Sequence, residues 1–179
     1  MKFAFKSAGT AMALAVAITV TSAAGGLAQA ASKTIVETAA GSNDHTTLVA
    51  AVKAAGLVDT LSGKGPFTLF APTNAAFAKL PAGTVDTLLK PENKAQLTKV
   101  LTCHVVATEA MAAAVGKMIN DGGGTAKVQT VGGCTLTAKM SGDKVQLVDE
   151  KGQTATVTVA DLKQSNGVIH VIDTVLLPG

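Results

Sequence analysis

The sequence of 179 residues contains no arginine, no tryptophan and no tyrosine, and all of its basic residues are lysines. Arginine is the usual bidentate partner of phosphate and of guanine. The formal net charge is only +3, and the lysines form no cluster along the chain. The composition therefore argues against nucleic-acid binding. It also argues against binding to membranes through a polybasic surface.

Long hydrophobic runs are missing too, because a membrane-spanning helix needs about 20 apolar residues. The apolar run from Ala11 to Val20 follows two lysines and precedes Ala28-Gln29-Ala30. This order is typical of a secretory signal, and it fits better than a retained amphipathic N-terminus. We expect residues 1–30 to be a signal peptide and residues 31–179 to be the mature protein, one domain without an integral membrane segment. The protein is thus predicted to be secreted or periplasmic.

Cysteine is scarce, with only Cys103 and Cys134. In an exported protein an isolated pair most often forms one structural disulfide. The bond would close a loop of about 30 residues, which the chain-entropy model values at about 3–4 kcal/mol. Two alternatives remain: a redox-active pair, for which the Cys-x-x-Cys motif is missing, and a metal site shared with a histidine, for which no ligand spacing is visible.

The mature chain divides into a helical half and a strand half. Apolar residues recur at helical spacing in the first half, where Thr46 or Thr47 is expected to cap a helix and Thr108 to Met118 to form another. Later the period changes to two, as in Ala155, Val157 and Val159. The apolar segment from residue 168 to 177 predicts a central strand. The fold class is therefore α+β, an antiparallel sheet with helices packed on one side.

Three segments in register resemble the fasciclin domain family. They are Thr68 to Phe77 (TLFAPTNAAF), Asn166 to Asp173 (NGVIHVID), and the central LTCHVV segment around His104. The match extends from about residue 34 to 178. The resemblance implies a fasciclin-like wedge or sandwich of about seven mainly antiparallel strands, with a helical cluster on one side.

The resemblance also implies a function. Family members are extracellular or periplasmic modules linked to adhesion and matrix contact, without catalytic residues and without a required cofactor. We therefore expect a non-enzymatic surface-interaction module, monomeric, whose partner is a protein or polysaccharide of the cell envelope or matrix.

The residues of the three motifs are expected to be mainly structural. Thr73 can cap a helix, Asn166-Gly167 is a turn pair, and Asp173 needs hydrogen-bond donors, which we expect near the first motif. The full set of motif residues is Phe70, Pro72, Thr73, Asn74, Phe77, His104, Asn166, Gly167, His170 and Asp173.

Two places are candidates for interaction with a partner. In the central motif, Cys103 replaces the tyrosine that the family usually carries before His104, and this tyrosine–histidine region is tied to cell binding in animal members. Asp161-Leu162 resembles the Asp-Ile portion of an integrin-recognition sequence, but its surroundings do not match. We therefore expect a strand end at Asp161-Leu162.

Two further functions stay open as alternatives. An alanine-rich helical half could leave an apolar groove for a small ligand, which would make the protein a periplasmic carrier and would need a pocket of roughly 300 Å³. His104 and His170, with Asp173 as an orienting group, could instead serve a hydrolase. The sequence has no Gly-x-Ser-x-Gly nucleophile elbow, no glycosidase-like carboxylate pair and no phosphate-binding glycine loop, so two satisfied histidines are the favoured interpretation.

Overall fold

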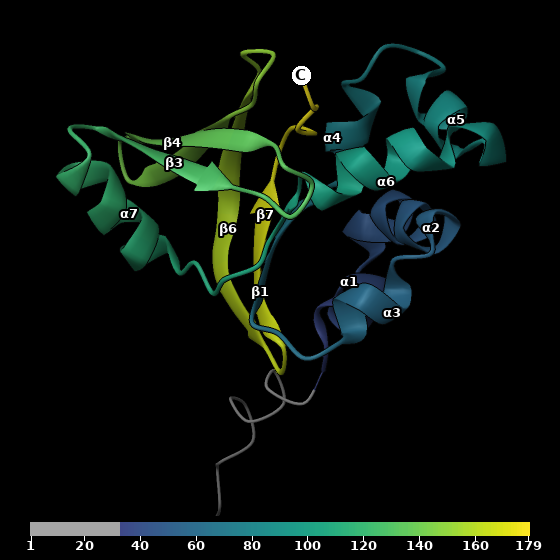
Figure 1. The fold of residues 1–179 in the computed structure, drawn as a ribbon, viewed down its shortest axis with the longest axis horizontal. Helices are drawn as coiled ribbons and strands as arrows, with labels where there is room; N and C mark the ends of the chain where they lie inside the picture. The colour runs from purple at the N-terminus through teal and green to yellow at the C-terminus, as the bar shows by residue number, and fades with distance from the viewer. Residues whose placement is uncertain (1–32) are drawn as a thin grey trace, which may run out of the picture.

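The computed structural model describes residues 33–179, so the predicted signal peptide lies outside the described residues. Figure 1 shows a wedge of strands with the helices from α1 to α6 gathered on one side and α7 on the other. In chain order the elements are α1 (Ile35–Ala40), η2 (Asn43–His45), α2 (Thr46–Ala55), α3 (Val58–Ser62), β1 (Phe67–Pro72), α4 (Asn74–Ala78), α5 (Thr84–Leu89), η3 (Pro91–Asn93), α6 (Lys94–Thr102), β2 (Val105–Val106), α7 (Ala112–Asp121), β3 (Thr125–Gln129), β4 (Thr135–Ser141), β5 (Lys144–Val148), β6 (Thr154–Gln164) and β7 (Gly167–Ile172).

The strands form one mixed sheet in the order β2-β1-β7-β6-β5-β4-β3. β1 and β7 are parallel, paired from Phe67 with Gly167 to Pro72 with Ile172, and the other neighbouring pairs are antiparallel. The central position predicted for the last strand is confirmed. The first and last family motifs, about 100 residues apart in sequence, therefore lie side by side.

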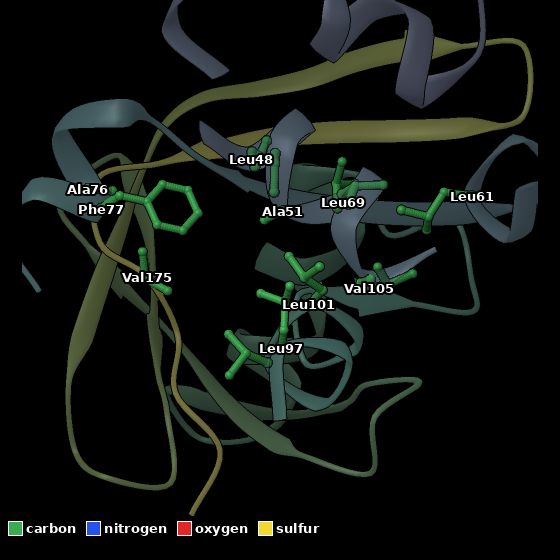
Figure 2. Close-up of a cluster of buried hydrophobic side chains, with 14 of the residues drawn as sticks. Leu48, Ala51, Leu61, Leu69, Ala76, Phe77, Leu97, Leu101, Val105 and Val175 are labelled. Atoms are coloured by element: carbon green, nitrogen blue, oxygen red, sulfur yellow. The ribbon is translucent and has the colours of Figure 1, made fainter. Parts of the chain in front are cut away.

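Two apolar clusters pack against this sheet. The first joins the helical side to β1 and β7, and Figure 2 shows Leu48 and Ala51 of α2, Leu69 of β1 and Leu101 of α6 within it. The second lies between α7 and the strands β3 to β6, and it includes Phe70. Burying a side chain of this size stabilises the fold by about 1.5–3 kcal/mol. β1 contributes to both clusters, because its side chains alternate between the two faces.

Helix α2 begins without the predicted side-chain cap from Thr46 or Thr47, and that prediction is wrong. The Oδ1 atom of Asn74 accepts the backbone N–H of Thr47 at 3.0 Å and the hydroxyl of Thr46 at 3.2 Å. A residue of the first family motif thus satisfies the free donors at a helix start 27 residues earlier.

Helix α7 begins at Ala112, four residues after the predicted start at Thr108. The hydroxyl of Thr68 donates to the carbonyl of Thr108 at 2.6 Å and accepts the N–H of Ala110 at 2.8 Å. These bonds attach the backbone of residues 108–110 to the side chain of Thr68 in β1. The segment therefore stays outside the helix.

Strand β6 carries two register shifts, between Val157 and Val159 and between Val159 and Leu162. Each shift adds a residue to β6 relative to β7 and turns the following side chains toward the other face. Val159 is 46% exposed, so the predicted inward alternation fails at this residue. Asp161-Leu162 lies inside the strand at the second bulge, and the predicted strand end at this position is wrong.

Candidate interaction site

The bulged part of β6, Thr158 to Lys163, is named here the exposed β6 segment, since all six residues are exposed. β7 pairs with it on one side, whereas β5 pairs with β6 only at Thr154, Ala155 and Thr156. Leu162 is 37% exposed and lies close in sequence to the exposed Val159. The segment is an accessible surface supported by the central strand of the sheet.

Asp161 is held in place on two sides. Its backbone φ is +58°, the one positive value at a residue other than glycine in the described chain. Its Oδ1 atom accepts the N–H of Ala112 at 2.7 Å, at the start of α7, and its own N–H donates to Nδ1 of His170 at 3.2 Å. Left-handed backbone costs about 1–2 kcal/mol at such a residue, and these two hydrogen bonds offset that cost.

His170 is buried beneath this segment, 3% exposed, with its ring stacked on Phe70 at 5.6 Å between centroids. Its Nδ1 accepts from Asp161, so Nε2 carries the proton and donates to the carbonyl of Ala110 at 2.6 Å. The ring therefore links β7, the bulge of β6 and the segment before α7. Both ring nitrogens therefore have hydrogen-bond partners within the fold.

His104 is fully buried on another side of the sheet. Its Nδ1–H donates to the carbonyl of Val100 at 2.8 Å, and its Nε2 accepts the N–H of Leu176 at 2.9 Å. Burial lowers the pKa of His104 to about 4, although the Val100 carbonyl and the charge of Asp149 act in the opposite direction. His104 is thus a neutral side chain that ties α6 to the C-terminal segment.

Asp173 has partners of its own. Its Oδ1 accepts the N–H of Thr156 at 2.8 Å and the hydroxyl of Thr174 at 3.1 Å, and Lys79 lies 3.7 Å from its Oδ2. Burial alone would raise the pKa of Asp173, but these hydrogen bonds and the lysine outweigh it and lower the pKa. The backbone and hydroxyl donors predicted near the first motif come instead from β6 and from Thr174, while Lys79, two residues after that motif, supplies an ion pair.

The hypothetical His–His–Asp arrangement therefore does not form: His104, His170 and Asp173 each bond to different groups. Within residues 33–179, no group of three or more His, Cys, Asp or Glu side chains could hold a metal ion. In the same range, no helix is long and apolar enough to cross a membrane.

The remaining motif residues build the scaffold. Thr73 caps α4 by accepting the N–H of Ala76 at 3.2 Å, as its position predicts. Asn166 accepts the N–H of Ile35 at 3.0 Å and donates to the carbonyl of Leu61 at 2.7 Å. Pro72 and Phe77 are buried, and Gly167 begins β7.

A disulfide joins Cys103, at the end of α6, to Cys134, immediately before β4, with their Cα atoms 5.4 Å apart. Both residues are buried. Next to the bond, Val131 N–H donates to the carbonyl of Val105 at 2.7 Å. Cys103 in the central motif is therefore part of a covalent link between the helical side and the β3–β4 hairpin.

The cavities separate into two kinds. Apolar cavities beneath α7, among α2, α5 and α6, and beside α1 have only about 10 Å³ each, which is room for one water-sized sphere. A polar surface cavity of about 420 Å³ lies where β1 and β7 begin. It is lined by Thr34, Ser62, Gly63, Lys64, Gly65, Pro66, Glu109, Gln164, Ser165, Asn166 and Gly167. Sequence reasoning missed Lys64 and Glu109 there, because nothing in the sequence places residues 45 positions apart in one cavity.

Comparisons with known proteins agree with this architecture. Protein sll1483 of Synechocystis is 54% identical over 145 residues, covering 81% of this chain and 73% of the relative. Immunogenic protein MPB70 of Mycobacterium bovis is 36% identical, covering 97% and 93%. Transforming growth factor-beta-induced protein ig-h3 of Sus scrofa is 36% identical, covering 81% of this chain and 19% of the relative.

Among solved structures, a FAS1 domain pair from the insect cell adhesion molecule fasciclin I matches with a TM-score of 0.73 at 18% identity. The match covers 82% of this chain and 51% of the pair. At that identity the likeness shows the fold alone. The family profile described as Fasciclin domain matches residues 43–178, and the chain belongs to this family.

Proposed function

We propose that this protein is an extracytoplasmic, non-enzymatic adhesion module that contacts its partner through the exposed β6 segment. The observation that carries the proposal is the presentation of this segment: Val159 and Leu162 are exposed beside Asp161, which is held by one hydrogen bond from its backbone N–H and one to its carboxylate. Rigid presentation of apolar and charged groups lowers the entropy cost of binding. The partner would be a protein of the cell envelope or matrix.

The relatives support the general role. One is named a cell surface glycolipoprotein, and the matching solved structure comes from a cell adhesion molecule. A buried disulfide fits an oxidising compartment outside the cytoplasm. The alternative of an apolar-ligand carrier loses its motive, because the apolar cavities of about 10 Å³ are far below the roughly 300 Å³ of a small-molecule pocket.

A cell-binding assay tests the proposal. Wells coated with the purified protein are incubated with cells of the source organism that lack the gene for this protein. The number of retained cells is compared with the number retained in wells coated with an unrelated secreted protein. The double variant Val159→Thr/Leu162→Thr should weaken binding at least about fivefold, because interface energy concentrates in a few apolar anchors. Asp161→Asn removes the charge while keeping the oxygen that accepts from Ala112.

The matched control is Met118→Thr/Met140→Thr, which changes two exposed apolar residues outside the segment. Its binding should equal that of the wild type. Wild-type binding no higher than the unrelated protein, or equal losses in both double variants, would contradict the proposal.

A further inference from the structure

The polar surface cavity carries an inference that is independent of the adhesion proposal, because its charged groups lie outside the exposed β6 segment. Its lining contains three glycines, one proline and seven residues with polar side chains. The polar residues of the lining offer hydrogen-bonding groups, which favour a polar ligand over a lipid. A volume of about 420 Å³ falls in the range of small-molecule sites.

The walls of this cavity are fixed before any ligand arrives. Asn166 donates to the carbonyls of Leu61 and Gly63, and accepts from Ile35, so one side chain joins α1, the end of α3 and the start of β7. A Cβ atom on Gly65 would overlap the carbonyl of Asn166, so only glycine allows these two backbone segments to approach so closely. The site therefore needs little reorganisation to bind.

The cavity offers one cation and one anion that are not paired with each other. Lys64 and Glu109 both line it, and neither makes a hydrogen bond or ion pair with the described residues. On the side of Lys64, the backbone N–H groups of Lys64 and Gly65 also find no backbone acceptor among residues 33–179. Donors thus gather on the loop that follows α3, and Glu109 supplies a carboxylate acceptor.

We propose that this cavity binds a small zwitterion, the ammonium and carboxylate groups of an amino acid or short peptide. The carboxylate is received by Lys64 and the free amides of residues 64 and 65, and the ammonium group by Glu109. Such hydrogen bonds between charged groups are the strong ones. A neutral polyol would leave both protein charges without a counter-charge.

The test is a titration of the ¹⁵N-labelled protein followed by NMR, with four forms of one molecule. Triglycine carries both charges, triglycinamide only the cation, N-acetyl-triglycine only the anion, and N-acetyl-triglycinamide neither. Triglycine should shift the amide signals of Gly63, Gly65 and Gly167. Removing either ligand charge should weaken binding about three- to tenfold.

Two variants assign each charge to its partner. In Lys64→Gln, triglycine and triglycinamide should bind equally, because the carboxylate has lost its cation. In Glu109→Gln, triglycine and N-acetyl-triglycine should bind equally. Lys117→Gln and Asp121→Asn, which change exposed charges of α7, should leave all four affinities unchanged.

Three outcomes overturn the proposal. One is the absence of shifts at these glycines up to the solubility limit of triglycine. Another is an equal affinity for all four forms. The third is a response to maltotriose but not to triglycine, which would assign the cavity to a polyol. Lys64 and Glu109 are both exposed, so we expect their substitution to preserve the fold. The dispersion of the NMR spectrum verifies that each variant is folded.

Discussion

Mild acidification should destabilise the protein mainly through His104. In the folded state, burial holds the pKa of His104 at about 4, while in the unfolded chain it returns to about 6.5. A second proton on Nε2 would place an N–H against the N–H of Leu176, which now donates to that atom at 2.9 Å. The unfolded state therefore takes up the proton first.

The sign and size follow from proton linkage. A folded pKa below the unfolded value stabilises the fold above about pH 6.5, and this stability is lost as the pH falls toward about 4. At 1.36 kcal/mol per pKa unit, the free energy of unfolding should drop by about 2 kcal/mol between about pH 7 and about pH 4.5. His45, whose pKa is also lowered mainly by burial, acts in the same direction.

The carboxylates act at lower pH, since the pKa values of Glu37, Glu150 and Asp173 are lowered from already acidic values. Urea unfolding at about pH 7, 5.5 and 4.5 covers the histidine window, and the carboxylate contribution is common to the wild type and a histidine variant. His104→Gln should be less stable at neutral pH and should show a flatter pH dependence than the wild type, and His45→Gln serves as the comparison. An unchanged slope in His104→Gln would refute the assignment to this side chain.

Three further predictions concern the scaffold. Mass spectrometry of the unreduced protein should find Cys103 joined to Cys134, and thiol labelling of both in the folded protein would contradict the bond. Replacing both cysteines by serine should lower the free energy of unfolding by about 3–4 kcal/mol. Gly167→Ala should reduce the yield of folded protein sharply, because a Cβ there would overlap a carbonyl of β1, and a normal melting curve would count against this contact. Gly116→Ala, in α7 with no atom within 4 Å of the added carbon, should instead stabilise the protein by up to about 1 kcal/mol in urea unfolding; a loss would point to an unseen contact.

The sequence predicts the features that depend on neighbouring residues. Thr73 caps the helix that follows it, as predicted, and the start of α1 at Thr34 and the end of α2 at Gly56, with a left-handed φ of 73°, are equally local. Each of these needs only the chemistry of one residue and its neighbours within a turn. The disulfide between the two lone cysteines could be predicted by counting, since only one pairing within the chain exists.

Features that depend on distant partners could not be predicted in this way. The start of α2 is satisfied by Asn74 and the start of α7 is delayed by Thr68, so tertiary contacts override the local signal at both helices. The bulges of β6 do not interrupt the alternation of apolar and polar residues in its sequence. This alternation predicts that Val159 points inward, although its side chain is exposed. The candidate interaction surface lies at the place where the pattern fails.

This division has a physical reason. The family motifs meet at the parallel pairing of β1 with β7, where they fix the sheet, two helix starts and the backbone of the bulge through His170. Residues that carry so many internal bonds have no capacity left for a partner. We propose binding through groups outside these motifs, namely the exposed β6 segment and the charges of Lys64 and Glu109.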